Sequence, residues 1–227
     1  MKLNGKFRAA LAVAIALAAA GIADGWAAKP LKSFQFVAMG DMPYSWPAHK
    51  RFQKLIAAIN ETKPAFSIHI GDLKSGGSPC GTEIDRARPY FDLFENPLVY
   101  TPGDNDWTDC HRASAGGFDT RERLAYLRKL FFPGPESLGK NPMPLVRQSD
   151  TSEFTEMVEN ARWEWGGIVF ATVHLVGRDN NIGRDRQEFR ARDEANVAWI
   201  EAAFARAGES GSHGLVLAFQ ADMFGLF

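Results

Sequence analysis

The sequence has neither an excess of charge of one sign nor a long apolar run after its first thirty residues. Its 227 residues include 26 Lys and Arg and 27 Asp and Glu, which gives a formal net charge of −1 without a long basic stripe. Recognition of nucleic acid through its phosphates needs such a stripe, so we expect no nucleic-acid partner. The lack of a second apolar run predicts no membrane span beyond residue 30.

Cysteine is also scarce. Only Cys80 and Cys110 are present, and neither belongs to a Cys-x-x-Cys pair, so a zinc or redox role is the weaker alternative. In an oxidising compartment we predict that the two form a disulfide. Closing a loop of about 30 residues would stabilise the fold by roughly 3–4 kcal/mol in the chain-entropy model.

The first thirty residues have the features of a targeting segment. Three basic residues precede an apolar run of about a dozen residues, Ala9 to Ala20, which is too short for a bilayer span of ~20 residues. Small residues then favour cleavage after Ala27, with Ala23 as a second candidate. The sequence therefore predicts a signal peptide over residues 1–27 and a periplasmic or secreted mature protein. An uncleaved membrane anchor is the alternative.

The rest of the chain predicts a single α/β domain over residues 33–227. Apolar residues make up 45% of the sequence and charged residues 23%, as in ordinary globular proteins. Three apolar strands alternate with two amphipathic helices in the first half. The strands are 34–39, 65–70 and 98–101, and the helices are 48–62 and 85–94. Short connections in this order indicate a parallel sheet.

The second half of the chain has a different pattern. An antiparallel hairpin, formed by 154–165 and 168–176, is expected to join the sheet. A long helix over 188–207 is expected to face inward with Val197, Ile200 and Phe204. The remaining elements are a helix over 121–130, a Pro- and Gly-rich loop to about 145, and a strand over 215–219.

Each of the three predicted parallel strands ends in a glycine followed by an aspartate. These residues are Asp41, Asp72 and Asp104. Because the carboxyl ends of parallel strands meet at one edge of a sheet, the three carboxylates should lie side by side. Without a cation between them they would repel one another, so the pattern favours a site for divalent metal ions over three unrelated turns.

The three blocks resemble those of the calcineurin-like metallophosphoesterase superfamily, in particular its exported bacterial members. The blocks are Gly40-Asp41, Gly71-Asp72 and Gly103-Asp104-Asn105-Asp106, and the resemblance covers roughly Ser33 to Met223. It implies two packed mixed β-sheets flanked by helices. It also implies two divalent metal ions, with Fe, Mn or Zn as candidates, and hydrolysis of a phosphate mono- or diester by a metal-bridged hydroxide.

The resemblance assigns roles residue by residue. Asp41 would bind the first metal, Asp72 would bridge both metals, and Asp104 would bind the second. Asn105 stands where the family has a proton-donating histidine, and Asp106 stands where that histidine is oriented by an acid.

The sequence also departs from the family pattern. Pro43 replaces a ligand histidine, and Asn105 cannot act as a general acid near neutral pH. Gln220 follows a strand where the family has another histidine, and its carbonyl oxygen would be a weaker ligand for the metal. The last family block, Gly-His-x-His, is absent, so we expect that the final strands are missing and that the chain is truncated at its C-terminus.

Histidines elsewhere could replace the missing imidazoles. His111 follows the third block and is a candidate proton donor. His174 could approach the metals from a second sheet, although a structural role is favoured, and His69 is expected to be a core residue with its hydrogen bonds satisfied. The expected substrate is a small-molecule or lipid phosphoester. The alternatives are a non-catalytic exported metal- or ligand-binding protein and an inactive fragment.

Overall fold

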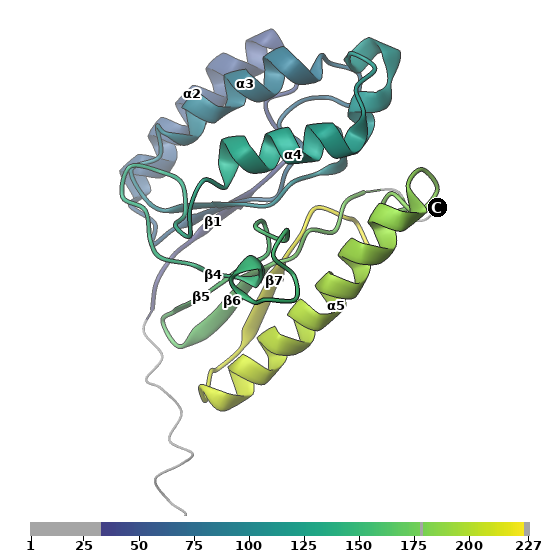
Figure 1. Ribbon diagram of the computed structural model, residues 1–227. Coiled ribbons are helices and arrows are strands. Elements are labelled where there is room, and N and C mark those ends of the chain that lie inside the picture. Colours follow the sequence, from purple (N-terminus) through teal and green to yellow (C-terminus); the bar gives the residue numbers. More distant parts are fainter. Residues whose placement is uncertain (1–32, 178, 225–227) are drawn as a thin grey trace, which may run out of the picture.

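The structure is a computed structural model that describes residues 33–177 and 179–224 (Figure 1). The predicted signal peptide, residues 1–27, lies outside the described residues. Within the described ranges, no helix is both long and apolar enough to cross a bilayer.

The first half of the chain forms a three-stranded parallel sheet, as the β-α-β-α-β pattern predicts. Strands β1 (Val37–Met39), β2 (Ser67–His69) and β3 (Leu98–Tyr100) lie side by side in that order. They are connected by α2 (Trp46–Thr62) and α3 (Cys80–Phe91). Helix α3 starts five residues earlier than the sequence pattern predicted and ends three residues earlier, with Pro89 inside it.

The second half forms a separate sheet, and this corrects the expectation that the hairpin joins the first one. The hairpin consists of β5 (Ala161–Trp165) and β6 (Ile168–Thr172), which pair antiparallel. Gly166 and Gly167 turn the chain with φ of 59° and 86°, a region that glycine adopts readily. The sheet order is β4-β5-β6-β7, where β4 is Val146–Arg147 and β7 is Leu215–Ala218.

Two further helices complete the described fold. Helix α4 (Thr120–Phe131) packs near α3, and α5 (Arg186–Glu209) lies along β6 and β7 (Figure 1). Four short 3-10 turns occur between the longer elements, at Asp104–Asp106, Thr108–His111, Ala113–Ala115 and Gln148–Asp150.

The inward face of α5 is not the predicted one. Val197 and Phe204 are 51% and 60% exposed. The buried face instead carries small residues, polar residues and one tryptophan. Trp199 donates its indole N–H to Thr172 O at 3.1 Å. This helix contacts its sheet through hydrogen bonds as well as apolar area, and periodicity of apolar residues alone points to the wrong side.

Two apolar clusters hold the described layers together. One contains residues from α2, α3 and α4, packed against the first sheet, and includes Phe52, Phe91 and Leu127. The other contains residues from both sheets, such as Phe66 of the segment leading into β2 and Phe170 of β6, whose ring centroids are 5.0 Å apart. Strands β2 and β3 are therefore buried along their whole length, which explains why these segments read as apolar runs, whereas β1 is partly exposed.

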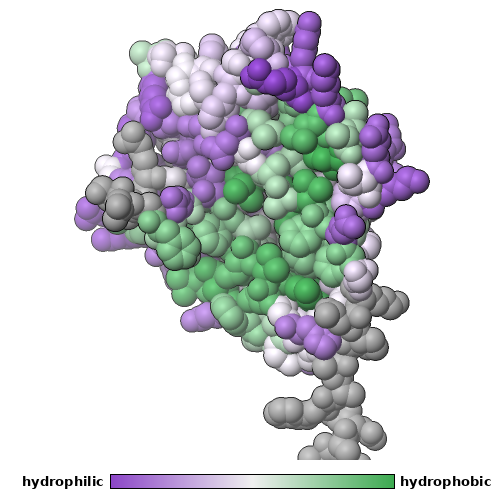
Figure 2. Space-filling model, turned by 180° about the vertical axis from the view of Figure 1, so that it is seen from behind, coloured by the Kyte–Doolittle hydropathy of each residue, from purple (hydrophilic) through white to green (hydrophobic). Residues whose placement is uncertain are grey.

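Figure 2, seen from behind, shows a broad apolar area on the surface. Strands β1 and β7 form edges of the two sheets within the described part of the chain. All four residues of β7 are partly exposed, and the nearby chain before β1 includes Phe36, which is 39% exposed.

The predicted disulfide between Cys80 and Cys110 is confirmed, with a Cα–Cα distance of 5.7 Å. Both residues are fully buried. The bond ties the first residue of α3 to the 3-10 turn that follows the third Gly-Asp block. It therefore restrains the segment that carries Asp104.

We predict that replacing both cysteines by alanine lowers the free energy of unfolding by about 3–4 kcal/mol, because the unfolded chain regains the entropy of a 30-residue loop. Urea unfolding followed by circular dichroism measures the change. Wild-type protein unfolded in a reducing agent should show a similar loss. Equal stability of oxidised wild type and the double variant would contradict the prediction.

Candidate functional site

The three Gly-Asp turns lie side by side at the carboxyl ends of β1, β2 and β3, as predicted. Asp41 N donates to Gly71 O at 3.1 Å, which links the first turn to the second. Asp41 and Asp72 have nearly identical left-handed backbones, with φ of 58° and 59°. Non-glycine residues rarely adopt this conformation, and such strain concentrates at functional sites.

The glycines of these turns are needed because the turns pack so closely that a Cβ atom would overlap backbone or side-chain atoms of the neighbouring segment. A Cβ atom at Gly71 would lie 2.1 Å from Gly103 N, and one at Gly103 would lie 2.1 Å from Asp72 Oδ1. A Cβ atom at Gly40 would lie 2.6 Å from Ile70 Cγ1. The Gly-Asp pattern thus combines close approach of the turns with a carboxylate on each.

Asp106 holds the second and third turns together. Its fully buried carboxylate accepts hydrogen bonds from Asp72 N at 3.0 Å, Leu73 N at 2.7 Å and Gly103 N at 2.8 Å, and from the Tyr100 hydroxyl at 2.8 Å. Burial raises the pKa of Asp106, and the three backbone N–H donors act in the opposite direction. None of these four hydrogen bonds involves Asn105. The predicted role of Asp106 in orienting Asn105 therefore stays a prediction.

Three hydrogen-bond donors converge on the carboxylates. The Tyr44 hydroxyl lies 2.8 Å from Asp41 Oδ1 and 3.1 Å from Asp72 Oδ2. Asn105 Nδ2 donates to Asp72 Oδ2 at 2.8 Å. Gln220 Nε2 lies 3.4 Å from both Asp72 Oδ2 and Asp104 Oδ1. The structure therefore brings the four predicted metal ligands, Asp41, Asp72, Asp104 and Gln220, into one group. We call this group, together with Tyr44 and Asn105, the carboxylate cluster.

The electrostatics of the cluster reflect an excess of negative charge. Burial, together with the charges of Asp106 and Asp104, raises the pKa of Asp72 to about 9. The Tyr44 hydroxyl carries one hydrogen and cannot donate it fully to two ionised carboxylates. A proton or a cation at Asp72 resolves this conflict.

The donor chemistry of the cluster suits a hard cation. Among the described residues, no group of three or more His, Cys, Asp or Glu side chains forms a ready-made metal site. The cluster instead combines carboxylates with side-chain amides, and such oxygen donors are those that Mg²⁺, Mn²⁺ and Ca²⁺ prefer. Gln220 Oε1 accepts a hydrogen bond from Gly177 N, so its amide would have to rotate to offer this oxygen to a metal.

Lys74 is a site residue that sequence reasoning did not single out as functional. Its side chain is only 1% exposed, and its Nζ donates to Ser75 O at 3.0 Å. Burial lowers the pKa of Lys74, whereas the charges of Asp106, Asp109 and Asp72 favour its protonated form. Its position two residues after Asp72 was the available signal.

An open cleft of about 1330 Å³ adjoins the cluster at Asp104. One wall comes from the turns after β3 and the other from the loop after β6. Its lining residues are Asp104, Thr108, Asp109, His111, Arg112, Gly177, Asp179, Asn181, Gly183 and Arg184. The volume exceeds what a phosphate group fills and is large enough for an organic substrate.

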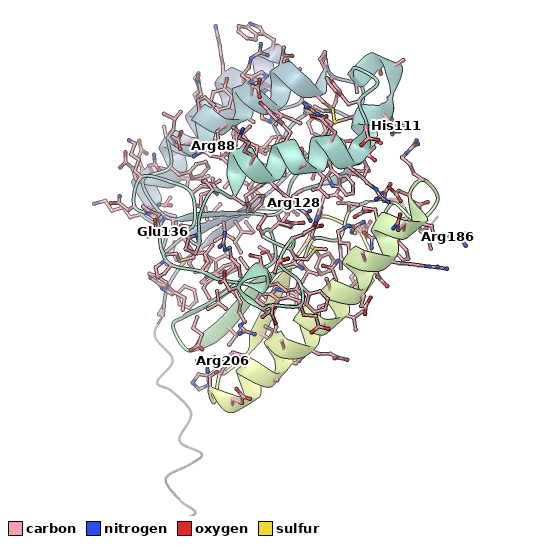
Figure 3. The ribbon with its side chains drawn as sticks, in the orientation of Figure 1. Arg88, His111, Arg128, Glu136, Arg186 and Arg206 are labelled. Carbon is pink, nitrogen blue, oxygen red and sulfur yellow. A yellow bond between two sulfur atoms is a disulfide. The ribbon has the colours of Figure 1, made fainter. Side chains whose placement is uncertain are left out.

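His111 lines this cleft, as the proton-donor hypothesis requires. Figure 3 shows it at the end of the molecule where α5 begins. Its Nδ1 lies 2.7 Å from Thr108 O, and because a carbonyl oxygen only accepts, Nδ1 carries a hydrogen. The neutral ring therefore has its lone pair on Nε2. Arg112, nearby on the same wall, pairs with Asp109 Oδ1 at 2.8 Å.

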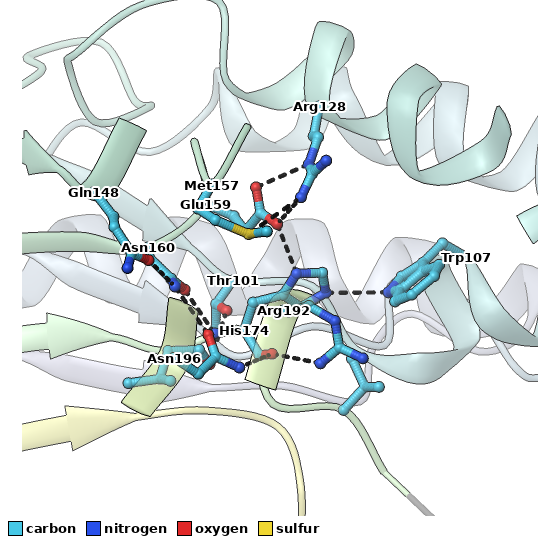
Figure 4. A network of polar contacts seen from close by, with 12 residues as sticks. Thr101, Trp107, Arg128, Gln148, Met157, Glu159, Asn160, His174, Arg192 and Asn196 are labelled. Atoms are coloured by element: carbon cyan, nitrogen blue, oxygen red, sulfur yellow. Dashed lines mark hydrogen bonds and ion pairs between the residues drawn. The ribbon is translucent and has the colours of Figure 1, made fainter. Parts of the chain in front are cut away.

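His174 has the structural role that the sequence favoured. It is fully buried, with Nδ1 at 2.7 Å from Glu159 Oε1 and Nε2 accepting from the Trp107 indole N–H at 3.1 Å (Figure 4). Burial alone would raise the pKa of Glu159, but Arg128 and His174 hold it well below its ordinary value. This network links the second sheet to Trp107, which directly follows the third block.

Comparison with known proteins found no matching family model, curated protein or solved structure.

We predict that Gly103→Ala destabilises the protein by about 1–3 kcal/mol or more, because its Cβ would overlap the Asp72 carboxylate. Gly134→Ala is the matched control, since a Cβ atom there meets nothing within 4 Å. Thermal unfolding of both variants measures the difference. Equal melting temperatures for the two variants would show that the turns are not closely packed.

We also predict that His69 makes stability depend on pH. The ring is buried, its Nε2 lacks a partner among the described residues, and burial lowers the pKa of His69 to about 4. The unfolded chain, with a pKa near 6.5, takes up a proton first, so stability is lost as pH falls below about 6.5. The expectation that all its hydrogen bonds are satisfied is therefore corrected.

The non-titrating variant His69→Asn should lack this loss. Between pH 7 and 5 the wild type should lose about 2 kcal/mol more than the variant in urea unfolding. Parallel stability curves for the two proteins would contradict the prediction.

Proposed function

We propose that this protein hydrolyses a phosphate mono- or diester with a divalent cation bound at the carboxylate cluster. The observation that supports this most is the meeting of Asp72, Asp104 and Gln220. They come from different turns and from both halves of the chain, and Asp104 lines a cleft of about 1330 Å³. The calcineurin-like resemblance predicts this convergence, and a four-layer arrangement of two sheets between helices is part of the proposal.

The carboxylates would hold the cation, and Mg²⁺ or Mn²⁺ suits their oxygen atoms better than the imidazole-bound metals of the family. A bound cation would supply Lewis-acid polarisation of the phosphoryl group and a lowered pKa for attacking water. Asp106 keeps Asp72 and Gly103 in register through their backbone N–H groups. The protein's own contribution is thus a preorganised set of negative charges.

His111 and Arg112 are the residues that we assign to substrate on the cleft wall. As an imidazolium, His111 would hold a proton on Nε2 and pass it to the leaving oxygen, since its Nδ1–H is committed to Thr108 O. Arg112, held in place by Asp109, would bind a phosphoryl oxygen. Asn105 would orient Asp72 by its side-chain hydrogen bond.

The proposed setting is an exported protein acting on a small-molecule or lipid phosphoester. The Cys80–Cys110 disulfide is compatible with an oxidising compartment. The charge balance of −1 gives no support for nucleic acid as a substrate.

A non-catalytic binding protein is the second candidate. Tyr44, Asn105 and Gln220 already place donors on Asp72 Oδ2 at 3.1, 2.8 and 3.4 Å. These donors partly replace the charge compensation that a cation gives. The cluster could therefore be stable in a protein that binds a ligand and catalyses no hydrolysis.

We predict that Asp72→Asn lowers Mn²⁺-dependent hydrolysis of p-nitrophenyl phosphate or bis(p-nitrophenyl) phosphate by at least about 100-fold, because the carboxylate shared across the cluster loses its charge. Asp92→Asn is the control, since that carboxylate pairs with Arg88 on the surface. Unchanged activity of Asp72→Asn would refute the proposed site. Metal binding without activity on any phosphoester would favour the binding protein.

A further inference from the structure

We infer that the carboxylate cluster takes one divalent cation, between Asp72 and Asp104, because the Tyr44 hydroxyl fills the space between Asp41 and Asp72. The inference rests on the proposed function and departs from the two cations that the family resemblance implies. It concerns how many cations this particular chain can hold.

The space between Asp41 and Asp72 is the position that two carboxylates would share in a first metal site. The Tyr44 oxygen lies 2.8 Å from Asp41 Oδ1 and 3.1 Å from Asp72 Oδ2. A cation bound to both oxygens at about 2.1 Å would have to occupy the volume of that hydroxyl. Asn105 Nδ2 also donates to the Tyr44 hydroxyl, at 3.3 Å, which helps to hold it there.

At the first position, the residue that the resemblance expects as a histidine ligand is a proline. Pro43, two residues after Asp41, has no side-chain donor atom. Asp41 itself is exposed, whereas Asp72 is 4% exposed. A cation held by the Asp41 and Asp72 carboxylates would have to displace the Tyr44 hydroxyl, and one of these two carboxylates is exposed.

The space between Asp72 and Asp104 differs in three ways. Gln220 Nε2 is 3.4 Å from each carboxylate, so these are weak hydrogen bonds and the gap is less firmly filled. The group in this gap is the Gln220 amide, and rotating it would present its carbonyl oxygen to the cation. A neutral tyrosine hydroxyl is a weaker ligand than an amide carbonyl oxygen. Asp104 also lines the cleft, which gives this position access to substrate.

Mn²⁺ binding to the purified mature protein tests the inference. Equilibrium dialysis with metal analysis counts the ions per chain, and electron paramagnetic resonance separates an isolated Mn²⁺ from a coupled pair. We expect wild type to bind one isolated Mn²⁺. Asp104→Asn should weaken that binding by at least about tenfold, because ligand charge sets affinity at such sites.

Two further variants identify the position of the ion. Asp41→Asn should still bind one Mn²⁺, whereas in a two-cation site it would lose one of two. Tyr44→Phe, which removes only the hydroxyl of a residue that is 38% exposed, should admit a second Mn²⁺ at higher concentration and give a coupled signal. Circular dichroism and thermal unfolding show that each variant is folded.

The outcomes separate this inference from the proposed function. Two tight ions in wild type would overturn the inference and leave the function standing. One ion that is lost in Asp41→Asn and kept in Asp104→Asn would place the cation at the other position and also overturn it. A Tyr44→Phe variant that never exceeds one ion would refute the role of the hydroxyl. No binding at all would overturn the metal-dependent function itself.

Discussion

The close packing of the second and third Gly-Asp turns is the constraint on which the rest of the candidate site depends. Gly71 and Gly103 approach so closely that a Cβ atom on either would overlap backbone or carboxylate atoms of the other turn. Asp106 fixes this contact by accepting backbone N–H groups from both turns. Two carboxylates, on Asp72 and Asp104, are thereby held together at a cost in electrostatic repulsion. Burial, followed by the charges of Asp106 and Asp104, raises the pKa of Asp72.

The second sheet contributes to the candidate site in two ways. The buried Glu159–His174–Trp107 chain of hydrogen bonds anchors the segment after the third block. Its members are fully buried and mutually paired, so removing one would leave an unpaired polar or charged group. The same sheet delivers Gln220 to the carboxylates. The site therefore depends on how the two sheets pack, and not on the parallel sheet alone.

The histidines show how tertiary environment divides one residue type into different roles. His69 is enclosed by aromatic rings beneath the second turn, and its buried ring stays neutral at ordinary pH. His174 is held between Glu159 and Trp107 and has no free nitrogen for a substrate. His111 alone of these three lines the cleft. Burial and hydrogen-bond partners, which come from segments distant in the chain, fix these roles.

The sequence by itself determined the parallel β-α-β-α-β half, the positions of the three aspartates and the disulfide, because each follows from local periodicity, from turn glycines or from the number of cysteines. Only the tertiary structure decided the separate second sheet, the inward face of α5 and the place of Tyr44. Val197 and Phe204 look like core residues by spacing, yet hydrogen bonds such as that of Trp199 turn the other face inward. Contacts between distant segments set these features, and local sequence does not encode them.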